Sequence, residues 1–69
     1  MKEKVDQYLA ENMPTDWTFK VWDTTNTINI TAKRPHNTGT YKLQTDMRHP
    51  MPDVIEFVRM CALFTEVAS

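Results

Sequence analysis

The chain contains little cysteine and little glycine, with one residue of each among its 69 positions. Because Cys61 has no second cysteine to pair with, no disulfide can form within one chain, and this favours a reducing compartment. A single glycine, Gly39, excludes the glycine-rich loop that cradles phosphate groups in many nucleotide-binding proteins. These two scarcities argue against a disulfide-stapled secreted domain and against a nucleotide-binding enzyme.

Long apolar runs are also missing. A membrane-spanning helix needs about 20 consecutive apolar residues, and no stretch of the sequence approaches that length. The segment that opens the chain, MKEKVDQYLA, carries none of the apolar run typical of a secretion signal. We therefore expect no membrane contact and a cytoplasmic location.

Side chains that could do chemistry are few and form no recognisable constellation. Cys61 could meet His36 or His49 only through folding, and it stands on the apolar side of the predicted last helix, where cysteine is usually a small core residue. Asp46, His49 and Asp53 are close in sequence, but no second cysteine or histidine cluster completes a tetrahedral metal site. We expect no enzymatic activity, no cofactor and no metal.

Hydrophobic spacing predicts five elements of secondary structure. Val5, Tyr8, Leu9 and Met13 recur at helical spacing, and Pro14 ends this helix. Three stretches then alternate apolar and polar residues, as half-buried strands do, and an apolar stretch led by prolines follows them. The predicted elements are a helix over 2–13, strands over 17–23, 27–33 and 40–46, and a helix over 53–67.

The order α-β-β-β-α predicts an α+β fold in a single domain, 1–69. The simplest arrangement is a two-layer sandwich, in which a three-stranded antiparallel meander has both helices on one face. A chain of this length buries only about 60% of the surface that its unfolded form exposes, so its stability is marginal and a partner would add to it. The residues predicted to face inward are Trp17, Phe19, Val21, Ile28, Ile30, Tyr41 and Leu43.

The element order and the length resemble the double-stranded-RNA-binding domain. That family opens its last helix with a basic run, where this chain has Met51, Pro52 and Asp53. The family's Gly-Pro-x-His loop between the first two strands is also missing. The resemblance therefore implies the topology of the fold and does not imply RNA binding.

The predicted outer face of the sheet is basic and rich in threonine, and it carries one large aromatic residue, Trp22. Residues 17–49 have a net charge of +3, whereas 1–16 and 50–69 have −2 each. An aromatic side chain among lysines is typical of surfaces that stack nucleic-acid bases and of hot spots in protein interfaces, although Trp22 could equally cover the strand end. The candidate binding residues here are Lys20, Trp22, Thr31, Lys33, Arg34 and Lys42.

The predicted last helix is apolar around most of its circumference, which is a wider arc than one sheet needs. The residues expected to face the sheet are Val54, Val58, Cys61 and Ala62, with Phe57 turned to another side. The residues expected to form a contact patch are Met60, Leu63, Phe64 and Val67. This patch predicts a homodimer or an obligate hetero-complex, unless the first helix and the C-terminal tail cover it.

These observations favour a small non-enzymatic protein-interaction module. It would occupy a surface of a protein partner, as an adaptor or a stoichiometric inhibitor, in the way of many small accessory proteins of phages and mobile elements. The alternative is a nucleic-acid-binding module that uses the basic outer face of the sheet. Salt distinguishes the two, because phosphate binding weakens steeply with salt and apolar contacts do not.

Overall fold

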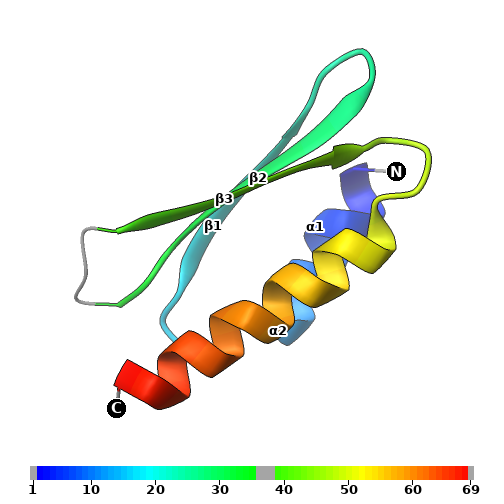
Figure 1. The fold of residues 1–69 in the computed structure, drawn as a ribbon. Coiled ribbons are helices and arrows are strands. Elements are labelled where there is room, and N and C mark those ends of the chain that lie inside the picture. Colours follow the sequence, from blue (N-terminus) through cyan, green and yellow to red (C-terminus); the bar gives the residue numbers. More distant parts are fainter. Residues whose placement is uncertain (1, 36–38, 69) are drawn as a thin grey trace.

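The structure of the chain is a computed structural model that describes residues 2–35 and 39–68, with side chains described as far as residue 65. The predicted order of elements is confirmed (Figure 1). The structure contains α1 (Lys2–Asn12), β1 (Thr18–Asp23), β2 (Thr27–Lys33), β3 (Thr40–Asp46) and α2 (Met51–Ala68).

The three strands form one antiparallel sheet in the order β1-β2-β3. Ile30 in β2 stands opposite Val21 in β1 and Leu43 in β3, so these three side chains share the inner face of the sheet. The alternation of apolar and polar residues therefore matches the pleat on all three strands. The predicted inward direction of Ile28 and Ile30 is confirmed because both are buried, and Ala32, the next residue of the same parity, is buried as well.

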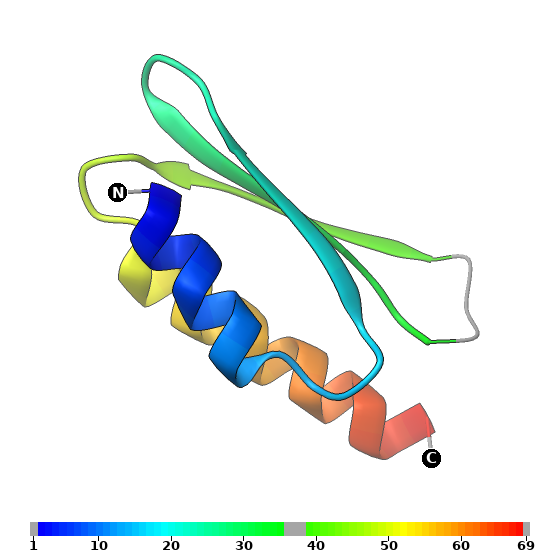
Figure 2. The ribbon, with the colours of Figure 1, turned by 180° about the vertical axis from the view of Figure 1, so that it is seen from behind.

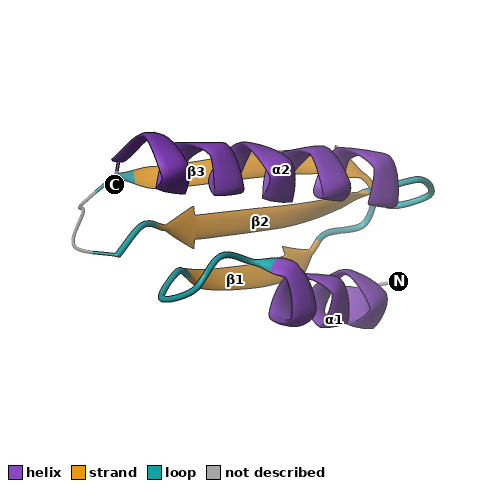
Figure 3. Cartoon of the chain, turned by 90° about the horizontal axis from the view of Figure 1, so that it is seen from below, coloured by secondary structure: helices purple, strands orange, loops and turns teal. Residues whose placement is uncertain are grey.

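Both helices lie on the same face of the sheet, as predicted (Figures 1 and 2). Figure 3 shows α2 lying along β3 and α1 on the side of β1, and each helix contacts the strand beneath it as well as the other helix. The core fills the space between these two layers. The buried apolar side chains are Val5, Leu9, Trp17, Ile28, Ile30, Ala32, Val54, Phe57, Val58 and Cys61.

The last helix begins at Met51, two residues earlier than the sequence pattern predicts. Pro50 is buried and its carbonyl oxygen accepts a 3.0 Å hydrogen bond from the backbone N–H of Val54, which closes the first helical turn. Pro52 fits within this turn because its missing N–H would have no partner there. The α2 helix runs antiparallel to β3. Asp53, near the start of the helix, lies beside Thr45 near the end of the strand, and Phe64, near the end of the helix, lies beside Tyr41 near the start of the strand.

An aromatic cluster fills the other end of the sandwich. Tyr41 lies between Trp17 and Phe64, with ring centroids 5.6 Å and 5.1 Å away. Ala32 stands opposite Tyr41 on the neighbouring strand and is buried. The indole N–H of Trp17 donates a 2.7 Å hydrogen bond to Thr65 Oγ1, which ties the start of β1 to α2.

Two predictions about the faces of α2 are wrong. Phe57, expected away from the core, is buried within it, and Ala62, expected against the sheet, is exposed. Val54, Val58 and Cys61 are buried as expected, so the buried face of the helix is shifted toward Phe57 and away from Ala62. Neither helix, over the described residues, has the length and apolar content that a bilayer crossing requires.

Candidate functional site

The outer face of the sheet carries the polar residues of all three strands in rows. Register places Lys20, Thr31 and Lys42 side by side across the sheet. The next row toward the β1–β2 turn is Trp22, Asn29 and Gln44, and the row on the opposite side is Thr18, Lys33 and Thr40. The fold thus brings Lys20, Trp22, Thr31, Lys33 and Lys42 together on one surface, as the sequence predicts.

Trp22 is exposed on this surface, with 44% of its side chain accessible to solvent. Its indole N–H has no hydrogen-bond partner among the described residues. A shallow hollow of about 350 Å³ lies beside the ring and is bounded by Asn29, Lys42 and Gln44, among others. The residue therefore stands clear of the core and can be reached by a ligand.

Arg34 is not part of the outer face. Its guanidinium group is turned toward the helix layer. There, Nη1 donates a hydrogen bond to the hydroxyl of Tyr41, and Nη2 donates one to the backbone carbonyl of Phe64. Each bond is 3.4 Å long. Arg34 comes directly after Lys33, so its position continues the inward series of Ile28, Ile30 and Ala32 rather than the outward series of Thr31 and Lys33. Its contacts indicate a structural role at the aromatic end of the core.

The predicted patch on α2 is divided among different environments. Met60 is 46% exposed and Leu63 is also exposed, whereas Phe64 is half-buried against Tyr41. The side chain of Val67 lies outside the described part of the chain. Met60 and Phe64 lie on the flank of α2 that borders a hollow beside β3, whereas the exposed Leu63 does not line it.

That flank and β3 enclose an apolar groove of about 260 Å³, which we call the edge groove. Its floor and walls come from β3 and α2, and charged side chains stand at its rim. The apolar lining consists of Tyr41, Leu43, Phe57, Met60, Cys61 and Phe64. The charged residues of α2 at its rim are Asp53 and Glu56, and Lys42, whose side chain lies on the outer face, also borders it.

The strand beside the groove has an unpaired edge, since β3 is the last strand of the sheet. Met47 N–H donates a 3.0 Å hydrogen bond to the carbonyl of Asn26, one step beyond the Thr27–Asp46 pair. Bonded and non-bonded pairs alternate in an antiparallel ladder. Tyr41, Leu43 and Thr45 are therefore the residues of β3 that bond to β2.

The alternate residues Lys42 and Gln44 consequently direct their backbone N–H and C=O groups away from the sheet. These outward groups make no hydrogen bond within the described residues. The two side chains are exposed on the outer face, so they leave the edge itself open. The edge groove thus combines apolar side chains with free backbone donors and acceptors.

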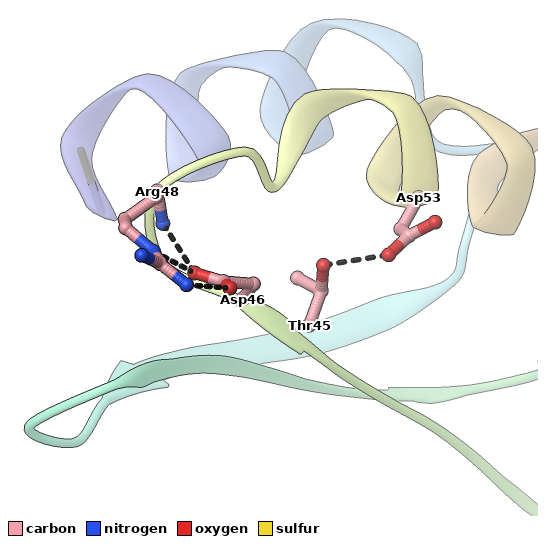
Figure 4. Close-up of polar contacts among 4 residues, drawn as sticks. All are labelled: Thr45, Asp46, Arg48 and Asp53. Carbon is pink, nitrogen blue, oxygen red and sulfur yellow. Dashed lines mark hydrogen bonds and ion pairs between the residues drawn. The ribbon is translucent and has the colours of Figure 1, made fainter.

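The carboxylates near the groove are engaged with neighbours. Thr45 Oγ1 donates a 2.7 Å hydrogen bond to Asp53 Oδ2, which joins β3 to the first turn of α2 (Figure 4). Glu56 Oε2 lies 3.8 Å from Arg59 Nη1 on the exposed side of the helix. These contacts position the rim charges without filling the groove.

Asp46 and Arg48 form a close ion pair at the end of β3 (Figure 4). The Asp46 carboxylate accepts hydrogen bonds from the Arg48 backbone N–H and from its guanidinium group. These bonds hold the pKa of Asp46 at about 2, below its ordinary value of 3.8.

Among the described residues, no three histidine, cysteine, aspartate or glutamate side chains form a group that could hold a metal ion.

Cys61 lies in the wall of the groove with its side chain almost fully buried. Burial raises the pKa of its thiol to about 11, because the thiolate would lose its hydration. At neutral pH the group is therefore a neutral thiol, which is a poor nucleophile. The prediction that Cys61 is a core residue is confirmed.

Sequence reasoning identified Met60 and Phe64 but missed the edge groove itself. The strand order already makes β3 an edge strand, and its even-numbered residues are polar, so the open edge could have been found from the meander. The groove could not, because it depends on the rotation of α2.

No protein-family model, curated protein or solved structure matches the chain. The likeness to the double-stranded-RNA-binding domain is one of element order.

Proposed function

We propose that the protein is a small, non-enzymatic interaction module that binds a partner protein at the edge groove. The observation that supports this proposal is a solvent-open apolar groove directly beside an unpaired strand edge. Such a module acts by occupying a surface of its partner, as an adaptor or a stoichiometric inhibitor. Accessory proteins of phages and mobile elements commonly work in this way.

Binding at the groove is favourable because it removes apolar surface from water. Met60 exposes nearly half of its side chain, and full burial of a methionine contributes about 1.5–3 kcal/mol. Covering Met60 alone would thus contribute about 1 kcal/mol, and the half-buried rings of Tyr41 and Phe64 lie next to it. An apolar centre with charged residues at its rim is the usual composition of a protein interface.

The chemistry of the lining suits binding better than catalysis. Cys61 is the one thiol in the wall, and its raised pKa keeps it protonated. Asp53 accepts a hydrogen bond from Thr45, Glu56 lies 3.8 Å from Arg59, and apart from Lys42 the remaining lining is apolar. A general acid or base needs a titratable group that reaches into the site.

Site-specific photo-cross-linking tests this proposal. Benzoylphenylalanine is placed at Met60 in one protein and at Ile55 in another, and both are irradiated in an extract of the cells that make the chain. The two positions are matched, because Ile55 is 40% exposed on the opposite flank of the same helix. We expect a protein adduct of defined mass from position 60 and none from position 55. The same adducts from both positions would contradict the proposal.

The alternative function is binding of single-stranded nucleic acid on the outer face of the sheet. The exposed indole of Trp22, with Lys20 and Lys42 both in the neighbouring row of the sheet, favours it. One base stacked on an aromatic ring contributes about 1–3 kcal/mol, and each phosphate contact adds salt dependence. Binding of a labelled oligothymidine that weakens about tenfold or more between 50 and 200 mM salt, and that Trp22→Ala abolishes, would support this alternative.

A further inference from the structure

We infer that the edge groove takes an extended segment of the partner chain, which adds to the sheet as a fourth strand along β3. This inference rests on the proposed function and specifies the form of the bound partner. It follows from the backbone of β3, from the position of the groove relative to that backbone, and from the position of α2.

The backbone of β3 offers two residues for pairing. Lys42 and Gln44 direct both N–H and C=O toward the open edge, while Tyr41, Leu43 and Thr45 are bonded to β2. A guest strand can therefore form four main-chain hydrogen bonds with this edge in an antiparallel arrangement. A guest helix would leave all four groups unpaired, because its own N–H and C=O groups are bonded within it.

The groove lies where the inward side chains of such a strand would point. A guest residue directly opposite Lys42 shares the outer face with it, so the guest residues on either side turn inward, toward Leu43, Met60 and Phe64. The groove volume of about 260 Å³ exceeds the ~150 Å³ that admits a benzene molecule. It can thus receive apolar side chains from alternate positions of one strand.

A second copy of the chain does not fit at this edge through its own β3. Antiparallel pairing of the two β3 strands would place them about 4.8 Å apart, with both α2 helices on the same face. Since α2 lies along β3 (Figure 3), the two α2 helices would stand side by side above strands with only this spacing. Packed helices need 8–10 Å between axes, roughly twice that distance. The edge accepts a strand that carries no helix above it.

Charge specifies the guest sequence further. Lys42 stands on the outer face at the middle of the edge, and an acidic guest residue opposite it would form a cross-strand pair. The two flanking guest residues enter the apolar groove. The preferred guest is therefore an extended segment with the pattern apolar–acidic–apolar, and the same lysine disfavours pairing with basic segments.

The test uses a pool of capped synthetic heptapeptides that alternate Val, Ile, Leu or Phe with Glu or Thr. Peptides selected on the immobilised protein are titrated into isotope-labelled protein and followed by NMR. We expect the amide signals of Lys42 and Gln44 to shift most and their hydrogen exchange to slow. N-methylation of the guest amides that face β3 should weaken binding about tenfold or more, since each lost hydrogen bond is a substantial part of the affinity.

Two variants of one residue isolate the backbone contribution. Gln44→Pro removes an outward N–H without removing a bond to β2. An edge strand tolerates proline at positions of this kind, where the N–H points away from the sheet. It should weaken peptide binding about tenfold, whereas Gln44→Ala should bind as the wild-type protein does. If Gln44→Pro does not fold, the N-methylated peptides make the same test on the guest strand.

Three results would overturn the inference. They are no binding by any member of the pool up to ~1 mM, equal binding of N-methylated and unmethylated peptides, and shifts confined to the outer face around Trp22. A protein adduct from position 60 combined with any of these results leaves the proposed function standing and removes the fourth strand. If that adduct is absent but peptides still pair with β3, the fourth-strand inference stands and the proposed function is removed.

Discussion

Thr45 Oγ1 donates a 2.7 Å hydrogen bond to Asp53 Oδ2, which joins the end of β3 to the start of α2. Thr45 is only 5% exposed, so this bond satisfies a hydroxyl that water cannot reach. It also sets the helix against the strand at one end, while the stacked rings of Tyr41 and Phe64 do so at the other. The edge groove lies between these two attachments.

Removing this hydroxyl should destabilise the fold modestly. Thr45→Val keeps the shape of the side chain but loses the bond to Asp53, whose exposed carboxylate can return to water. We expect the free energy of unfolding to fall by about 1–2 kcal/mol, the range for a hydrogen bond to a charged group whose partner is rehydrated. Urea denaturation measures this loss, with Gln44→Ala as the exposed neighbour control. Equal stability of Thr45→Val and wild type would mean that the bond contributes nothing.

The buried thiol of Cys61 should make stability decrease at alkaline pH. Its pKa is about 11 in the folded protein against an ordinary value of 9.0, so the unfolded chain loses this proton first. Ionisation then favours the unfolded state, and the free energy of unfolding should fall by about 1.4 kcal/mol for each pH unit between these two values. Below the lower value the effect is absent.

Cys61→Ala isolates this effect from the titration of lysines and tyrosines. The variant should lose on the order of 1 kcal/mol at neutral pH, because a small buried group is removed, and should show a shallower decline above pH 9. Native Cys61 should also react slowly with thiol reagents and quickly in urea. Fast labelling of the folded protein would contradict the buried position of the Cys61 thiol.

The Asp46–Arg48 pair should be visible in an acid titration. Because hydrogen bonds from Arg48 hold the pKa of Asp46 at about 2, its carboxylate signal should titrate near that value in NMR spectra. Arg48→Gln should move the midpoint toward 3.8, the ordinary value. The lowered pKa stabilises the fold above the ordinary value, and this contribution is lost as pH falls through the folded-state value. An unchanged midpoint in Arg48→Gln would show that the pair does not form.

The sheet could be predicted almost completely from the sequence because alternation leaves one choice of register. Moving β1 by one position would turn Phe19 and Val21 to water and bury Lys20, so the pattern itself excludes the alternative. The strand bounds of 27–33 and 40–46 agree with the structure for the same reason. The exposure of Trp22 on the outer face follows from this parity as well.

The helix α2 could be predicted as an element but not in its rotation. Its apolar arc is wide enough that several faces could pack on the sheet, and the structure buries Phe57 rather than Ala62. With the helix in this orientation, Phe57, Met60 and Phe64 line the edge groove together with β3. Arg34, in contrast, could have been placed by parity, because it continues the inward series of Ile28, Ile30 and Ala32, and its contacts with Tyr41 and Phe64 agree with that direction.

The two tryptophans should respond oppositely to truncation. Trp17 is 7% exposed and its indole N–H donates to Thr65, whereas Trp22 is exposed and its indole N–H has no partner within the described residues. Trp17→Ala should lower the free energy of unfolding by about 3–5 kcal/mol, and Trp22→Ala should change it by less than about 0.5 kcal/mol. Under the edge-groove proposal, Trp22→Ala still gives the protein adduct from position 60. Under the nucleic-acid alternative, the same variant loses about 2 kcal/mol of binding free energy toward oligothymidine. Thermal melting and binding measured on the same variants distinguish the edge-groove proposal from the nucleic-acid alternative. A large fall in the melting temperature of Trp22→Ala would instead identify the ring as a cover for the strand end.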